Sequence, residues 1–432
     1  MRSTTRTLAL LTALATTLTL MTAPAAAEYR HGDHGHHHGG HGEGHGTGHG
    51  AAEIRFATFN ASLNRASAGE LAADLATGTD TQAHTVAEII QRVRPDVLLL
   101  NEFDYDARGR AAELFQEKYL SVPHEGAAGI DYRYRYTAPS NTGIASGFDL
   151  DNDGVAVTEP ETAGYGDDAF GFGAFPGQYG MVVYSRYPIA TDKVRTFQKF
   201  RWADMPDALL PTAPDTGEPF YSAAELARLR LSSKSHWDIP IRAGRGRSVH
   251  LLASHPTPPS FDGPEQRNVK RNHDEIRFWA DYVRPWRAGY IYDDEGQRGG
   301  LHPGAAFVVA GDLNADPNDG DGHPDAIAQL LDSRRVNSAV VPTSAGGAEA
   351  AQAQQGANTD HTGAPAQDTA DFADTPGPGN LRVDYVLPSR GLAVRDAGVF
   401  WPTSDDPLSR LTGSYPFPSS DHRLVWLDLH RR

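Results

Sequence analysis

Short apolar runs that each stop at a polar side chain recur along the chain and limit the folds open to it. VVAGDLN (308–314) is apolar up to Gly311 and then reaches Asp312 and Asn314. Alone, such a residue is usually a turn or cap residue. A layered sheet, however, brings many strand ends to one edge. Runs of this kind end or begin at Asn60, Glu102, His255, Asp312, Asp384, Asp421 and His422.

The segments between these residues alternate between strand and helix patterns. HTVAEIIQRVR (84–94) has apolar residues at helical spacing, Pro95 stops that helix, and DVLLLNEFD (96–104) is typical of a buried strand. The pattern predicts a mixed α/β layered domain. Further strands are expected at 53–62, 180–185, 248–255, 306–312, 382–388 and 422–429, and a long helix at 268–284.

Two segments interrupt this alternation. Residues 125–178 are rich in Gly, Asp and Tyr, and residues 343–380 are rich in Ala, Gln, Gly and Pro with little apolar content. We interpret both as insertions and expect the second to be a mobile surface loop. No domain linker is evident after residue 53, so residues 53–432 are predicted to form one domain.

The N-terminus resembles a targeting segment. Arg2 and Arg6 precede a short apolar run at 8–21, and APAAA (23–27) offers a small-residue cleavage site. Residues 1–27 are therefore predicted to be a secretory signal peptide, and the protein to be secreted. No other stretch is long and apolar enough to span a bilayer, and no stable membrane association is expected.

A His- and Gly-rich tract, within residues 28–52, follows the predicted signal peptide. Eight of the twenty residues at 31–50 are His and nine are Gly, so the tract has no apolar side chain to bury and is predicted to be a disordered tether. Clustered His residues bind Zn²⁺, Cu²⁺ or Ni²⁺ loosely. A plain soluble spacer remains the alternative.

Composition removes some chemistries and weighs against others. The chain has no Cys, which excludes thiol catalysis and thiolate–metal sites. Its formal net charge is −16, which argues against tight binding of duplex DNA because that depends on neutralising phosphates. The oxygen-rich strand ends instead suit a hard divalent cation, Mg²⁺ first, with Mn²⁺ or Ca²⁺ as alternatives.

At these strand ends the sequence resembles the endonuclease/exonuclease/phosphatase superfamily of phosphoesterases. The resemblance implies a four-layer α/β/β/α sandwich with two mixed β-sheets. It covers about residues 54–429. The matching pieces are TFN (58–60), NE (101–102), YGMVVYSRYPI (179–189), SH (254–255), GDLNA (311–315), VDYVL (383–387) and SDH (420–422).

The resemblance also implies roles for individual residues. Glu102 would bind the metal directly, with Asn60 and Asp421 near it. Asp312 would deprotonate the attacking water, and Asn314 would orient the water or the phosphate. The three remaining roles are phosphate contact by His422, support of His422 by Asp384, and phosphate binding or leaving-group assistance by His255.

Elementary chemistry supports the same reaction. Phosphoester hydrolysis needs an in-line water, a carboxylate base and neutralised phosphoryl oxygens. Which carboxylate is base and which is ligand stays open at this level.

Other charged residues suggest further contacts, each with a bland alternative. Phosphate-binding candidates near the motifs are Arg65, Lys234, His236 and Arg271, although a solvated charge is the commoner explanation for residues of this kind. DLDNDG (149–154) begins like a calcium loop, with Asp149, Asp151 and Asp153, but position twelve is Pro160 rather than Glu. A structural Ca²⁺ site and an acidic turn both explain it. Asp316 to Asp321 are interpreted as the loop that follows the site.

The predicted function is therefore a secreted, metal-dependent phosphoesterase acting as a monomer on phosphodiesters or small organic phosphates. An extracellular nuclease for DNA or RNA is the first alternative. A metal-capturing protein on an inactive phosphoesterase scaffold is the alternative from another class. Intact Glu102, Asp312 and His422 disfavour that last alternative.

Overall fold

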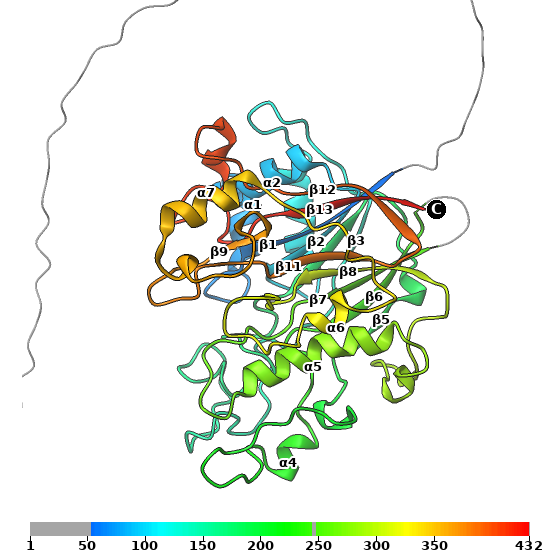
Figure 1. The fold of residues 1–432 in the computed structure, drawn as a ribbon, viewed down its shortest axis with the longest axis vertical. Helices are drawn as coiled ribbons and strands as arrows, with labels where there is room; N and C mark the ends of the chain where they lie inside the picture. Colours follow the sequence, from blue (N-terminus) through cyan, green and yellow to red (C-terminus); the bar gives the residue numbers. More distant parts are fainter. Residues whose placement is uncertain (1–52, 244–247, 432) are drawn as a thin grey trace, which may run out of the picture. The chain divides into compact units, whose positions relative to one another are not determined.

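The computed structural model describes residues 53–243 and 248–431. The predictions for residues 1–52, the signal peptide and the His-rich tether, lie outside these residues. Two large mixed sheets form the centre of the described part (Figure 1). The first has the order β12 (Leu392–Val399), β13 (Val425–Arg431), β1 (Ile54–Leu63), β2 (Val97–Phe103), β4 (Met181–Ser185), β3 (Tyr134–Tyr136).

The second sheet has the order β11 (Asp384–Pro388), β8 (Ala306–Asp312), β7 (Val249–Ser254), β6 (His236–Ile241), β5 (Arg195–Thr196). β1 and β2 run parallel, as do β7 and β8, whereas the other neighbours are antiparallel. A small hairpin is formed by β9 (Ala370–Asp371) and β10 (Asn380–Leu381). The helices are α1 (Glu70–Thr77), α2 (Thr81–Val93), α3 (Arg110–Phe115), α4 (Ala223–Leu226), α5 (Arg267–Tyr282), α6 (Ala328–Leu331) and α7 (Ala345–Gln354).

Alternating side chains place each sheet between two apolar layers. On β8, Val308 and Ala310 pack between the sheets, whereas Phe307 and Val309 face the cluster around α5. Figure 1 shows α5 lying along the second sheet. On β2, Leu98 and Leu100 pack with residues of α1, α2 and α3. Successive strand residues point to opposite faces of a sheet, and here both faces are covered by apolar layers. These runs are therefore apolar throughout. The predicted four-layer sandwich is confirmed.

Local signals explain where the elements begin and end. The Asp80 side chain accepts a hydrogen bond from the Ala83 amide at 2.7 Å and caps the start of α2. Arg94 ends this helix in the left-handed region, immediately before Pro95. β2 then begins at Val97, so the predicted helix–Pro–strand order is correct.

The segment 343–380 differs from the prediction of a surface loop without structure. It contains α7, which begins where the Ser344 side chain accepts a hydrogen bond from the Gly347 amide, and the hairpin of β9 and β10. Thr369 and Ala370 are buried. The many Ala residues carry too little apolar surface to reveal burial in the sequence, although Ala is the best helix former.

In the part of the chain that the structure describes, helices long and apolar enough to cross a membrane are absent.

Gly311 joins the fold to the strand end at Asp312. Its φ is 148°, and a Cβ there would lie 1.9 Å from the Ser254 carbonyl oxygen of β7. We expect Gly311→Ala to lower the free energy of unfolding by about 2 kcal/mol or more, because β7 and β8 must separate. Denaturant titration measures this. The control is Gly391→Ala, where a Cβ meets no heavy atom within 4 Å; equal losses in the two variants would contradict the explanation.

Candidate active site

The strand ends of both sheets converge as the sequence predicts. In the first sheet Asn60 of β1 is paired in register with Asn101 of β2. In the second sheet Asp312 of β8 is paired with Asp384 of β11. The side-chain Nδ2 of Asn60 donates a hydrogen bond to Asp312 Oδ2 at 3.1 Å, which joins the two sheets directly.

Asp312 is 1% exposed and is surrounded by polar groups. Its Oδ1 accepts a hydrogen bond from the Asn314 amide at 3.0 Å. Two imidazoles face its Oδ2, with Nε2 of His255 at 3.4 Å and Nε2 of His422 at 3.7 Å. Burial raises the pKa of Asp312 to about 6, although the positive charge of His422 opposes this.

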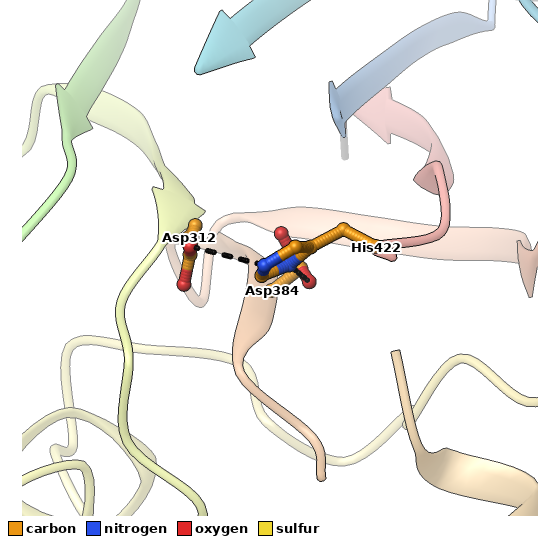
Figure 2. A group of neighbouring side chains, drawn as sticks. All are labelled: Asp312, Asp384 and His422. Atoms are coloured by element: carbon orange, nitrogen blue, oxygen red, sulfur yellow. Dashed lines mark hydrogen bonds and ion pairs between the residues drawn. The ribbon is translucent and has the colours of Figure 1, made fainter. Parts of the chain in front are cut away.

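His422 and Asp384 form a buried dyad beside Asp312 (Figure 2). His422 Nδ1 lies 2.9 Å from Asp384 Oδ2. Burial alone would lower the pKa of His422, but the carboxylates of Asp384 and Asp312 raise it well above its ordinary value. The ring is therefore held as a cation with Nε2 toward Asp312. Ligand atoms of these three residues also lie within 4.8 Å of one another, but a cationic ring does not bind a metal, so we interpret the group as a hydrogen-bonded dyad beside Asp312.

Thr369 fixes the Asp384 side of this dyad. Its hydroxyl donates to Asp384 Oδ2 at 2.9 Å and accepts a hydrogen bond from the Asp384 amide at 2.9 Å. The hydroxyl also accepts from the Val383 amide at 3.0 Å. Thr369 comes from the segment that the sequence indicated as a loop, and it acts through Asp384.

Glu102 supplies the carboxylate best suited to a divalent cation. It is a non-glycine residue at φ 55°, a backbone conformation that costs energy and directs its side chain into the cleft described below. Burial raises the pKa of Glu102, partly offset by the positive charges of His422 and Lys234. Among the described residues, Glu102 has no ion pair. A carboxylate that is disfavoured as an anion and lacks a cation partner fits a metal ligand.

The other two predicted metal residues lie around the same region. The Asn60 side chain, apart from its bond to Asp312, accepts a hydrogen bond from the Ser62 amide through Oδ1 at 3.2 Å. Asp421 Oδ1 lies 3.4 Å from the hydroxyls of Ser62 and Ser420. Asp421 and Glu102 both line the cleft that contains Asp312. The donor set is thus rich in oxygen, which hard cations prefer.

His255 and Asn314 complete the second-sheet side of the site. Burial, together with the charges of Lys234 and His422, lowers the pKa of His255 well below its ordinary value, so this ring is neutral. Asn314 Nδ2 donates to the Pro256 carbonyl at 3.1 Å and ties the loop after β8 to the loop after β7.

A cleft of about 710 Å³ lies above these groups. Glu102, His255, Asp312 and His422 line it, and so does Lys234, which is 7% exposed. Burial lowers the pKa of Lys234, while the carboxylate of Glu102 opposes this shift. A buried cation, a buried imidazolium and several carboxylates around one cleft suit an anionic substrate held together with a divalent cation.

A sequence model of the Endonuclease/Exonuclease/phosphatase family matches residues 57–422. The chain belongs to this family. Enzymes of the family are hydrolases of phosphoric esters that use divalent metals, and this protein is one of them. A comparison with curated proteins finds no match.

Solved structures of low sequence identity are similar to the chain. An endonuclease/exonuclease/phosphatase from Beutenbergia cavernae is 16% identical over 88% of this chain and 72% of that one, with a TM-score of 0.46. A family protein from Leptotrichia buccalis is 12% identical over 87% and 99%, with a TM-score of 0.44. A beta toxin from Staphylococcus aureus, with bound magnesium ions, is 11% identical over 88% and 100%, with a TM-score of 0.41.

Two of the four phosphate-binding candidates, Arg65 and His236, are fully engaged by other partners in the structure. The Arg65 guanidinium is bound by Asp74 at 2.7 Å and Asp80 at 3.0 Å. His236 lies between the Ser232 hydroxyl and the Glu275 carbonyl, and burial lowers its pKa to about 4. The geometry therefore does not support a phosphate role for Arg65 or His236.

Arg271 has an intermediate position. It donates to the carbonyls of Leu231, Phe170 and Arg230, but it also lines a cavity next to the cleft. Of the four candidates only Lys234 lines the cleft itself.

The acidic group at Asp149, Asp151 and Asp153 lies elsewhere, in the 125–178 segment. One carboxylate oxygen of each lies within 4.8 Å of the others. Their oxygens also accept hydrogen bonds from backbone amides of the same turn, including Gly154 to Asp149 at 2.9 Å. Both sequence interpretations, a Ca²⁺ site and an acidic turn, remain compatible with this arrangement.

Sequence reasoning missed residues that hold the site without facing substrate. Asn101 Oδ1 accepts hydrogen bonds from the Thr58 hydroxyl and, at 3.4 Å, from the Asp312 amide. Asp104 accepts from the amides of Arg65 and Tyr179, and burial raises its pKa to about 7. The available signals were the polar Asn101 inside the apolar run of β2 and Asp104 directly after that strand.

The role of Thr369 can be measured. We expect Thr369→Val to lower kcat about ten- to hundred-fold, because Asp384 loses a hydrogen bond that a charged acceptor normally strengthens. Thr369→Ser should recover most of the activity, since it keeps the hydroxyl. Unchanged kcat in a folded Val variant would show that Thr369 does not position the dyad.

Proposed function

We propose that this family member is a secreted phosphoesterase that uses Mg²⁺ to hydrolyse phosphodiesters or small organic phosphates. The observation that carries the proposal is the Asp384–His422 dyad beside buried Asp312, on the floor of a cleft that Glu102 also lines. Secretion is proposed from the signal-peptide pattern of residues 1–27.

Each group has a chemical task in this proposal. Glu102, with Asn60 and Asp421 nearby, would hold the metal, which when bound neutralises phosphoryl charge. Asp312 accepts a proton from the attacking water. A carboxylate with a pKa near 6 is a stronger base than an ordinary Asp and is still ionised at neutral pH.

The imidazoles and Lys234 deal with the phosphoryl oxygens. His422 is kept cationic by Asp384 and donates from Nε2 to a phosphoryl oxygen as negative charge develops there. Neutral His255, whose Nε2 lies near the same Asp312 oxygen as that of His422, contacts a non-bridging oxygen. Asn314 orients the water or the phosphate from the adjoining loop.

The charge of the cleft favours a small substrate over duplex DNA. Its walls include Asp316, Asp319 and Asp321, whereas Lys234 is the sole Lys or Arg among the described residues that line it. Duplex binding requires Lys and Arg to neutralise several neighbouring phosphates. A single phosphoester beside one metal makes no such demand, so the nuclease alternative ranks second.

Removing the proposed base tests the mechanism. We expect Asp312→Asn to lower kcat for bis-p-nitrophenyl phosphate about 10²- to 10⁴-fold, the usual contribution of a general base. His422→Ala should cause a loss of similar order. The matched control is Asp321→Asn, which removes an exposed carboxylate from the same cleft. Near-normal turnover in a folded Asp312→Asn variant would reject the assigned base.

Metal removal tests the cofactor and ranks the substrates. Treatment with EDTA should abolish hydrolysis, and adding Mg²⁺, Mn²⁺ or Ca²⁺ singly shows which ion restores it. With the best ion, we expect bis-p-nitrophenyl phosphate and p-nitrophenyl phosphate to be hydrolysed in preference to plasmid DNA, RNA and sphingomyelin. Activity that survives verified metal removal overturns the metal role, and preferred cleavage of plasmid DNA or RNA favours the nuclease alternative.

A further inference from the structure

A second cavity, of about 450 Å³, adjoins the catalytic cleft. The two share wall residues, among them Glu102, Lys234 and Phe261. The volume is within the range of small-ligand pockets. A phosphoester bound by Lys234 and by the metal that Glu102 would hold would therefore have one substituent next to this cavity.

Two exposed aromatic side chains, Phe172 and Phe261, are part of the cavity wall. Phe172 is 63% exposed and Phe261 is 92% exposed, although both are large apolar residues. The Phe172 ring is nearly parallel to the Tyr179 ring, at 30° and with centroids 6.5 Å apart. Flat, solvent-facing rings at a cavity are suited to stacking on a planar group.

The Phe172 ring lies close to Gly166, where the absence of a Cβ leaves room for it. A Cβ on Gly166, which also lines the cavity, would lie 2.8 Å from the Phe172 ring. Gly166 and Phe172 both belong to the 125–178 segment. The ring position thus depends on this segment of the chain and not on the strands that carry the catalytic residues.

Two cationic side chains, Lys234 and Arg271, also line the cavity. Lys234 is buried at the junction and has neither an ion pair nor a side-chain hydrogen bond with the described residues. The Nε and Nη2 atoms of Arg271 are bonded to backbone carbonyls, whereas its Nη1 has no such partner among the described residues. Lys234 lines both cavities without an anionic partner among the described residues, so its positive charge is available to a substrate phosphate.

We propose that this cavity binds one ester substituent of the substrate and that this substituent is a flat ring system, aryl or nucleobase, with its phosphate at Lys234. The proposal rests on the proposed phosphoesterase function. A DNA duplex is too large for a cavity of this volume. A long alkyl chain could bury apolar surface in this cavity but would gain nothing from stacking on Phe172 and Phe261.

Binding of simple monoesters tests the proposal. The probes are methyl, hexyl and phenyl phosphate and thymidine 5′-monophosphate, titrated by calorimetry into the metal-loaded Asp312→Asn variant, in which turnover is slow. We expect phenyl phosphate or thymidine 5′-monophosphate to bind about ten-fold more tightly than methyl phosphate, the ratio that one stacked ring gives. The tighter of the two identifies the aryl or nucleobase source.

Variants of Phe172 show whether stacking causes the preference. Phe172→Ala should reduce the ring-to-methyl affinity ratio close to one, Phe172→Leu should not restore it, and Phe172→Tyr should. Trp286→Ala removes an aromatic side chain that is 74% exposed and lines neither cavity, and it should leave the ratio unchanged.

The failures of the two proposals can be told apart. Equal affinity for methyl and phenyl phosphate, or hexyl phosphate binding as tightly as the ring esters, overturns the ring assignment even if the wild type hydrolyses esters. Failure of the wild type to hydrolyse any ester with any of the three metals overturns the phosphoesterase function. A ratio that persists in Phe172→Ala also overturns the assigned stacking residue.

Discussion

The buried carboxylate of Asp312 is the constraint around which the site is organised. A charge placed where two sheets meet is unfavourable unless hydrogen-bond donors and cations surround it. Asn60 comes from the first sheet to meet it, Asn314 from its own loop, and His422 from the segment before β13. The same contacts that satisfy Asp312 therefore hold the two sheets together at their polar edge, so fold and chemistry share one set of bonds.

Helix α5 gives this edge its rigidity. The Asn272 side chain donates to the carbonyls of Thr257, Leu313 and Asn314, which lie in the loops after β7 and β8. Buried Glu275 accepts hydrogen bonds from the amides of Ser233 and Thr257, at 2.6 Å each. One helix thus fixes three loops, including the one that carries Lys234. Sites supported in this way keep the geometry that electrostatic catalysis needs.

The sequence was informative where function and local pattern coincide. Strand periodicity predicted a layered α/β domain, and the polar residues at the strand ends predicted that Asn60, Glu102, Asp312 and His422 meet at one edge. The number of layers followed from the family resemblance. The sequence could not show which charged side chains already have a partner in the fold. Arg65 looked available although Asp74 and Asp80 bind it.

Supporting contacts between distant segments were equally hidden. Thr369 contacts Asp384, fifteen positions along the chain, from a segment with little apolar content. Hydrogen bonds of this kind leave no periodic trace, because they depend on how whole elements are packed. Their discovery requires coordinates.

The second cavity and the cleft are built largely from different kinds of segment. Its aromatic walls, Phe172 and Phe261, belong to loops, whereas the hydrolytic groups sit at the ends of strands. Loops accept replacement, insertion and deletion more readily than strands in a core. Substitutions in these loops can therefore change which ester substituent fits the cavity without altering the strand ends at the cleft.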